Sequence, residues 1–289
     1  MAAVSYVSTT IVPSTDGVHV ALHDLGGAGR PLVFCHATGF HGRVWQPVAD
    51  HLAGRFNCFA IDFRGHGDSI VPDGLRYEWA GMADDLLAVV DHLDDGAVLA
   101  AGWSMGGASI MLSEQRRRGT FAGAWLFEPI LIPSDGSYPV SAGGPSPLAE
   151  SARRRREIFD SREAAFDRYL SRPPFSTADE VALRSYVDHG FRDLDDGTVI
   201  LKCRGEVEAS VFDASLTDGF DHLGDVEIPV TVVASGDGLS PALIAPRVVE
   251  ALPDGRLEYF DDLTHFAPLE DPTQVAASIA AALDPAAQG

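Results

Sequence analysis

Short, nearly uninterrupted apolar runs recur along the chain and alternate with longer amphipathic stretches. The apolar runs occupy residues 31–37, 56–62, 97–103, 122–128 and 229–235. Runs of this kind are typical of strands that are buried on both faces of a sheet. Helical periodicity lies between them, at residues 43–52, 78–93, 105–118 and 241–252. The alternation predicts an α/β fold with a doubly wound, mostly parallel sheet, whose functional groups gather at the carboxyl ends of the strands.

The N-terminal segment has a different pattern. Apolar and polar residues alternate over Tyr6–Val12 and again over Val18–Leu25, and the turn-forming residues 13–17 separate the two stretches. This arrangement predicts an antiparallel pair of strands at one edge of the sheet.

The alternation of strand and helix patterns is interrupted between residues 134 and 222. That interval begins with a Ser/Gly/Pro-rich stretch and continues with helical patterns near 148–171 and 177–190, whereas 197–212 fits either a strand or a loop that leads into a helix. It is too long to be a simple connection. We therefore expect a core domain made of residues 1–133 and 223–289, with a helical cap inserted at 134–222.

Composition and charge narrow the classes of partner. The 289 residues carry a formal net charge of −21. The electric field of this negative charge repels nucleic acids and acidic membrane surfaces. The basic run 153–156 is better interpreted as a solvated helix face than as a nucleic-acid patch. Three cysteines, an odd number without zinc-type spacing, fit reduced thiols. No signal-peptide pattern or membrane-spanning run is found, so we expect a cytoplasmic location and no membrane partner.

One serine stands among glycines immediately after an apolar run, in the sequence GWSMGG at residues 102–107. Gly-x-Ser-x-Gly between a strand and a helix is typical of a nucleophile that a tight turn pushes above the sheet edge. Ser104 would sit at a helix N-terminus, where developing negative charge is favoured. A serine needs a base, and His265 follows the last apolar run on a loop before a C-terminal helix. We interpret His66, in a glycine-rich loop, as structural.

Four motifs together resemble those of the α/β-hydrolase fold superfamily. They are HATGF at 36–40, similar to its oxyanion loop, DFRGHGDS at 62–69, GWSMGG at 102–107 and HFAPLE at 265–270. The resemblance implies that Ser104 attacks a carbonyl carbon while His265 moves the proton. It also implies an oxyanion hole formed by the N–H groups of Met105 and Thr38, although Ala37 replaces the usual glycine of that loop.

The resemblance leaves the acid of the triad open between two carboxylates. Asp237 follows the apolar run 229–235, where the acid usually lies, but Gly238 occupies the usual register. Glu128 ends the run 122–128, and its sequence surroundings resemble those of haloalkane dehalogenases that supply a glutamate from that strand. We favour Glu128 narrowly. Either residue could instead be structural, Glu128 by accepting backbone N–H groups and Asp237 by capping a helix.

These residues predict a cofactor-independent serine hydrolase that cleaves a carboxylic ester, thioester or lactone of a small, largely apolar molecule through an acyl-enzyme. We find no metal-binding or nucleotide-binding motif, and we expect neither a metal nor a cofactor. Alternatives are a C–C bond hydrolase, a perhydrolase, or a non-catalytic ligand-binding protein of the same fold. The predicted substrate pocket lies around the motifs and includes His36, Phe40, Trp103 and Phe127.

Overall fold

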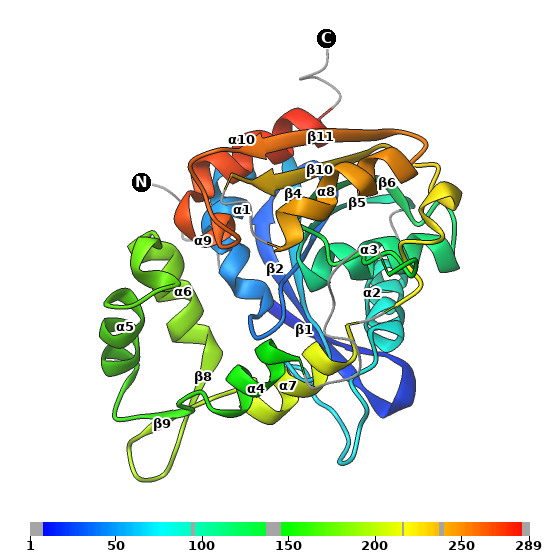
Figure 1. Ribbon diagram of the computed structural model, residues 1–289. Coiled ribbons are helices and arrows are strands. Elements are labelled where there is room, and N and C mark those ends of the chain that lie inside the picture. The colour runs from blue at the N-terminus through cyan, green and yellow to red at the C-terminus, as the bar shows by residue number, and fades with distance from the viewer. Residues whose placement is uncertain (1–7, 94–95, 137–145, 216, 237–239, 285–289) are drawn as a thin grey trace.

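The computed structural model describes residues 8–93, 96–136, 146–215, 217–236 and 240–284. Within them, eight strands form one sheet in the order β1-β2-β4-β3-β5-β6-β10-β11 (Figure 1). The β1–β2 and β2–β4 pairs are antiparallel, and the other pairs are parallel. The predicted doubly wound sheet and its antiparallel edge are confirmed. The strands are β1 Ser8–Pro13, β2 His19–Gly27, β3 Arg30–Cys35, β4 Phe56–Asp62, β5 Val98–Trp103, β6 Phe121–Phe127, β10 Val230–Ser235 and β11 Gly255–Phe260.

Helices cover both faces of the sheet. One face packs against α2 (Trp79–Leu93), α3 (Met105–Arg116) and α8 (Ser240–Ala251), and the other against α1 (Gln46–Leu52) and α10 (Pro272–Leu283) (Figure 1). Because neighbouring strand residues point to opposite faces, Phe34 and Cys35 of β3 enter different hydrophobic clusters. All six residues of β5 are buried, as an apolar run in a central strand predicts.

The chain between β6 and β10 contains both helices and a small sheet. The helices are α4 (Pro147–Arg153), α5 (Arg162–Leu170), α6 (Glu180–Gly190) and α7 (Gly205–Asp213). The strands β7 (Ile158–Phe159), β8 (Phe191–Asp193) and β9 (Val199–Leu201) form a three-stranded sheet in the order β7-β9-β8. Figure 1 shows these elements beside and below the carboxyl ends of the central strands. The ambiguous pattern at 197–212 contains a strand followed by a helix, so both interpretations apply to parts of it.

The helical pattern predicted near 148–171 corresponds to two helices, α4 and α5, and not to one continuous helix. It is interrupted by residues 154–161, which include β7. Two side chains of the arginine run pair with acids on helix α7. Arg153 pairs with Asp213, and Arg155 pairs with Glu208. These two arginines are therefore neutralised within the protein.

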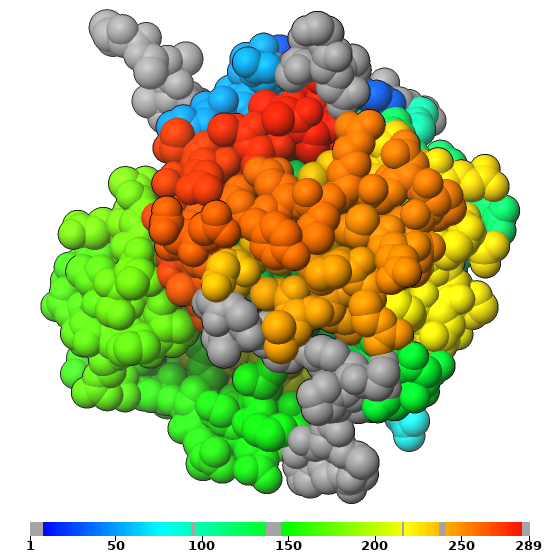
Figure 2. Space-filling model, turned by 45° about the horizontal axis from the view of Figure 1, so that its top comes forward, coloured from blue at the N-terminus to red at the C-terminus, as the bar shows by residue number. Residues whose placement is uncertain are grey.

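The chain between β6 and β10 is called the inserted segment from here on. Hydrogen bonds join it to the elements of the large sheet at several points. Ser185 Oγ of α6 donates to the carbonyl of Arg43 at 2.6 Å, and the Trp79 indole N–H of α2 donates to the carbonyl of Val211 in α7 at 2.9 Å. Lys202 forms an ion pair with Asp68. The segment also packs against the C-terminal part of the chain, where it lies side by side with the red and orange surface (Figure 2).

No helix within the described residues combines the length and the apolar character that crossing a membrane requires.

Candidate active site

Ser104 occupies a strained turn between β5 and α3. Its backbone has φ 56° and ψ −114°, a left-handed conformation that a non-glycine residue adopts only where the surroundings impose it. The flanking glycines explain why the turn can form. A Cβ on Gly106 would lie 2.3 Å from the carbonyl oxygen of Cys35, and one on Gly102 would lie 2.6 Å from the N atom of Gly107. The predicted sequence of strand, tight turn and helix is confirmed, and the Ser104 residue is 8% exposed.

Glu128 is the carboxylate that contacts the histidine. It follows β6 directly, is fully buried, and has φ 45°. Its N–H donates to the carbonyl of Val233 in β10 at 2.9 Å. One carboxylate oxygen accepts a hydrogen bond from His265 Nδ1, and the other accepts from the N–H and the hydroxyl of Ser235 at 2.8 and 2.5 Å. The structure thus brings the favoured acid to His265, while Asp237 lies outside the described residues.

Ser235 is a contact that the sequence interpretation missed. It is the last residue of β10, which pairs with β6 in parallel, so its side chain reaches the residue that follows β6. A polar residue at the end of an otherwise apolar strand was the signal available in the sequence. By donating two hydrogen bonds to Oε1, Ser235 fixes the carboxylate and leaves Oε2 for the imidazole.

His265 lies on the loop between β11 and α9 (Ala267–Glu270). Glu270 holds this loop by accepting from the N–H of Thr264 at 2.7 Å and from its hydroxyl at 2.9 Å. The imidazole stacks on the Phe127 ring with centroids 6.3 Å apart. Because Nδ1–H points to Glu128, the neutral tautomer leaves Nε2 as the proton acceptor. Ser104 Oγ forms no hydrogen bond to any described residue, and in enzymes this serine–histidine contact often tightens only when substrate binds.

The loop after β3 brings Thr38 beside the first turn of α3. The Thr38 hydroxyl donates to the sulfur of Met105 at 3.4 Å, so the two residues predicted to form the oxyanion hole are neighbours. Met105 opens helix α3, and N–H groups in the first turn of a helix have no partner within it. This proximity supports the predicted oxyanion hole, because both backbones lie at the same edge of the sheet as Ser104.

His66 holds the same loop in place. Gly39, which has φ 83°, donates its N–H to His66 Nε2 at 3.1 Å. The other ring nitrogen must then carry the proton, and it donates to the carbonyl of Arg64 at 3.1 Å. Burial lowers the pKa of His66 to about 4, so the ring stays neutral and can keep accepting. His66 therefore positions the loop, in agreement with its structural interpretation.

Both ring nitrogens of His36 are also hydrogen-bonded to backbone groups. Its Nδ1 donates to the carbonyl of Ala37 at 2.8 Å, and its Nε2 accepts from the N–H of Phe63 at 3.1 Å. The residue has no exposed surface, and burial lowers its pKa to about 3. The structure thus places His36 between the ends of β3 and β4, with no ring nitrogen left for a substrate.

The other three predicted pocket residues belong to an aromatic cluster around Ser104. The Phe40 ring lies 4.5 Å from that of Trp103, and Phe127 supports the imidazole of His265. Trp103 and Phe127 are fully buried, and Phe40 is 8% exposed. The Trp103 indole N–H is buried and has no hydrogen-bond partner among the residues that the structure describes. Phe40 is the member that also reaches the inserted segment, through Phe175 and Tyr186.

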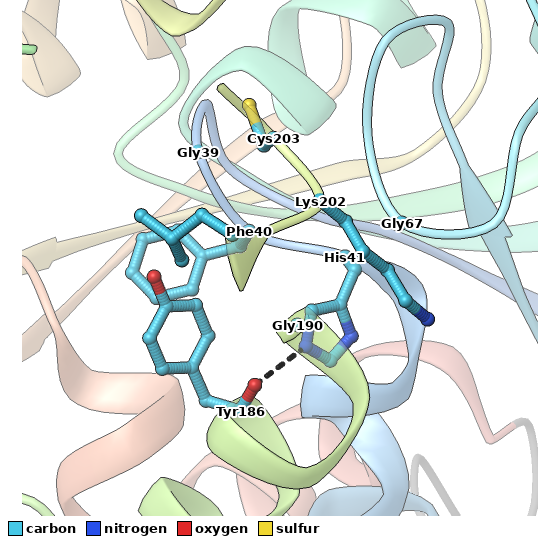
Figure 3. Close-up of a pocket in the computed structure, with 9 residues that line it drawn as sticks. Gly39, Phe40, His41, Gly67, Tyr186, Gly190, Lys202 and Cys203 are labelled. Carbon is cyan, nitrogen blue, oxygen red and sulfur yellow. Dashed lines mark hydrogen bonds between the residues drawn. The ribbon is translucent and has the colours of Figure 1, made fainter. Parts of the chain in front are cut away.

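Figure 3 shows a small cavity where the inserted segment meets the loop after β3. Its volume is about 10 Å³, which is room for a single water molecule. In the close-up, the Tyr186 ring lies beside Phe40, and the imidazole N–H of His41 points to the Tyr186 carbonyl at 3.0 Å. A molecule larger than water would fit in this cavity only if the aromatic side chains moved. The cavity is lined by Gly39, Phe40, His41, Gly67, Tyr186, Gly190, Leu201, Lys202 and Cys203.

One group of side chains in the described part of the chain has metal-ligand spacing. It consists of His23, Asp62 and Asp68. Each member already has a partner, because the His23 ring bonds to Asp62, Asp62 also accepts from the N–H groups of Gly42 and Asp68, and Asp68 pairs with Lys202. Burial raises the pKa of the Asp62 carboxyl, but the nearby histidines, His23 foremost, lower it to well below its usual range. The trio is therefore a closed hydrogen-bond network that orders the 62–69 loop.

Comparisons with known proteins agree with this fold. A model of the Alpha/beta hydrolase family matches residues 32–278. Lipase LipV of Mycobacterium tuberculosis (strain ATCC 25618 / H37Rv) is 28% identical over 281 residues, covering 93% of this chain and 98% of the lipase. The esterase RhEst1 from Rhodococcus sp. ECU1013 is 26% identical, with a TM-score of 0.71 over 94% of this chain and 97% of the esterase. The E-2-(acetamidomethylene)succinate hydrolase has a TM-score of 0.81 at 19% identity, over 96% of this chain and 100% of that one.

Proposed function

Because the chain belongs to the alpha/beta hydrolase family, we propose that it is a serine hydrolase that cleaves a carboxylic ester of a small molecule through an acyl-enzyme. The observation that carries the proposal is the buried Glu128 carboxylate bonded to His265 Nδ1 at the sheet edge where Ser104 occupies its strained turn. A base oriented by a carboxylate next to a serine nucleophile is the arrangement that acyl transfer requires. The likeness to a lipase and an esterase supports this class of substrate.

In the proposed reaction, Ser104 Oγ attacks the ester carbonyl while His265 Nε2 accepts the hydroxyl proton. The Glu128 carboxylate stabilises the imidazolium that forms. The N–H groups of Met105 and Thr38 bind the oxyanion of the tetrahedral intermediate. His265 then protonates the leaving alcohol. Water, deprotonated by the same imidazole, attacks the acyl-enzyme and releases the acid.

The decisive test of the nucleophile is the Ser104→Ala variant. We expect it to lose labelling by a fluorophosphonate probe and to hydrolyse p-nitrophenyl butyrate at least about 10³-fold more slowly than wild type. Ser113→Ala is the matched control, because Ser113 is a buried serine in α3, the helix that follows Ser104, and it should keep both properties.

Two results would contradict the proposal. Ester turnover by folded Ser104→Ala within tenfold of wild type would remove Ser104 as the nucleophile. Wild-type protein that neither reacts with the probe nor hydrolyses p-nitrophenyl esters of any chain length would favour the non-catalytic, ligand-binding alternative.

A further inference from the structure

Arg155 is a polar centre within the largely apolar surroundings of the site. It follows α4, and its guanidinium forms an ion pair with Glu208 of α7. The same guanidinium donates to the hydroxyl oxygen of Tyr186 in α6 at 3.0 Å and to that of Tyr169 in α5 at 3.3 Å. The side chain is 19% exposed, and Tyr186 only 1%. One arginine therefore connects several elements of the inserted segment.

Packing contacts link this polar centre to the nucleophile. The Glu208 carboxylate lies against Gly39, since a Cβ on that glycine would be 2.6 Å from Glu208 Oε1. Gly39 is next to Thr38 in the oxyanion loop. From the other side, the Tyr186 ring lies 5.1 Å from the Phe40 ring, which in turn contacts the indole of Trp103, the residue before Ser104. These ring contacts thus connect the polar centre, through Tyr186, Phe40 and Trp103, to the residue next to the nucleophile.

The hydrogen bonds of this centre leave donors without acceptors. Both tyrosine oxygens accept from Arg155, and among the described residues nothing accepts the hydroxyl proton of Tyr186. Burial raises the pKa of the Tyr186 hydroxyl far above its usual range, so the proton is retained. The buried indole N–H of Trp103 is a further donor that has no partner in the described part of the chain. A buried donor without an acceptor is unfavourable, and a ligand oxygen would remove that cost.

The charge balance indicates which oxygen fits. Arg155 is already neutralised by Glu208, and the whole chain carries a formal net charge of −21. A second carboxylate beside the pair would leave an uncompensated negative charge in a buried place, which is strongly unfavourable. A ketone or amide oxygen accepts hydrogen bonds without adding charge.

We propose that Arg155 and Tyr186 form a specificity-determining subsite that binds a neutral carbonyl oxygen on the acyl chain of the substrate. The subsite rests on the proposed ester hydrolysis, because the acyl chain is placed by its attachment at Ser104. The enzyme is then selective for oxo-substituted or amide-substituted acyl esters over plain alkyl esters.

The test compares p-nitrophenyl esters of 4-oxopentanoate, 5-oxohexanoate and 6-oxoheptanoate with the unsubstituted esters of equal chain length. We expect at least one oxo ester to exceed its alkyl partner in kcat/KM by about tenfold, mainly through a lower KM. Tyr186→Phe, which removes only the hydroxyl, should bring that ratio to about one. Tyr169→Phe removes the other hydroxyl that contacts the same guanidinium, on a less buried residue, and as the matched control it should keep the ratio.

Three outcomes would overturn the subsite. They are an oxo-to-alkyl ratio near one in wild type, a Tyr186→Phe variant that slows both esters equally, and a stronger preference for the half ester of a dicarboxylic acid. The second outcome would mean that the cluster only holds the inserted segment together.

A binding measurement separates this proposal from the proposed reaction. Ser104→Ala can be titrated with the methyl esters of the same acids and followed by calorimetry. We expect the preferred oxo ester to bind about tenfold more tightly than the alkyl ester, and the Tyr186→Phe substitution in that background to abolish the difference. Selective binding by a wild-type protein that turns over no ester would contradict the proposed hydrolysis but retain the subsite. Turnover without selectivity would retain the proposed hydrolysis and contradict the subsite.

Discussion

Two residues of the candidate site have strained backbones for the same reason. Ser104 and Glu128 both have positive φ, at 56° and 45°, and each is the first residue after a central parallel strand. The sheet fixes them there, because Ser104 N–H donates to the carbonyl of Phe127 and Glu128 N–H donates to that of Val233. Strain of this kind persists where the neighbouring strands over-determine the conformation. Each side chain consequently lies at the carboxyl ends of the parallel strands and not on a face of the sheet.

The clearest prediction at this scale concerns the acid. Glu128→Gln should lower kcat for p-nitrophenyl butyrate by about 10³–10⁴-fold with little change in KM, because the amide no longer stabilises the imidazolium and favours the wrong tautomer of His265. Glu114→Gln is the control, since Glu114 is a buried carboxylate that accepts backbone N–H groups at the far end of α3. A Glu128→Gln variant within tenfold of wild type would return the role to Asp237.

Sequence could identify some of these residues and not others. The glycines of the 102–107 motif and the loop position of His265 follow from local patterns, so Ser104 and His265 could be singled out. The choice between Glu128 and Asp237 could not be made, because β6 and β10 are neighbours and each carries a carboxylate after its end. Arg155 was interpreted with the rest of its basic run as part of a solvated helix face, because its bonds to three residues on other elements leave no local pattern.

At the scale of elements, the close packing of helix α3 on strand β3 positions the residues of the candidate site. Helix α3 approaches β3 so closely that Gly106 touches the carbonyl of Cys35, which brings the start of the helix to the oxyanion loop. The apolar runs predicted the central strands well, because strands buried on both faces have a uniform pattern. The interruption after α4 was not predicted, and the ion pairs of the arginines there, which join residues more than fifty positions apart, leave no local pattern.

Gly106→Ala tests this close approach. The added methyl group would force α3 away from β3, and we expect a loss of about 2–3 kcal/mol in the free energy of unfolding together with a large loss of kcat. Gly54→Ala is the control, because a Cβ there meets nothing within 4 Å. Urea unfolding followed by circular dichroism gives the comparison, and equal stability of the two variants would contradict the packing described for α3.

At the scale of the whole molecule, three buried histidines link stability to pH. Burial lowers the pKa of His36 to about 3 and the pKa values of His41 and His66 to about 4. In the unfolded chain such groups take up protons near pH 6.5. Between about pH 6.5 and 4 the unfolded state therefore binds more protons than the folded state, and stability falls as the pH is lowered.

We expect the free energy of unfolding to be nearly constant from pH 8 to 7 and to decline below about pH 6.5, by about 1.4 kcal/mol per pH unit for each histidine involved. Urea unfolding at pH 7.5, 6.5, 5.5 and 4.5 measures the slope. His41→Gln should reduce the slope by about 1.4 kcal/mol per pH unit, the contribution of one proton. The same substitution at the exposed His19 should leave the slope unchanged. A slope that is unaffected by His41→Gln would show that this histidine is not kept neutral by the fold.

The ion pair between Lys202 and Asp68 has a practical consequence. Lys202 is the only lysine among the 289 residues, so the chain has a single side-chain amine, and it lies where the inserted segment meets the sheet domain. A dye attached through amine chemistry, with the α-amino group blocked, would mark that junction alone. Its emission could then report in real time whether the segment lifts away when an ester enters and settles again when the acid leaves.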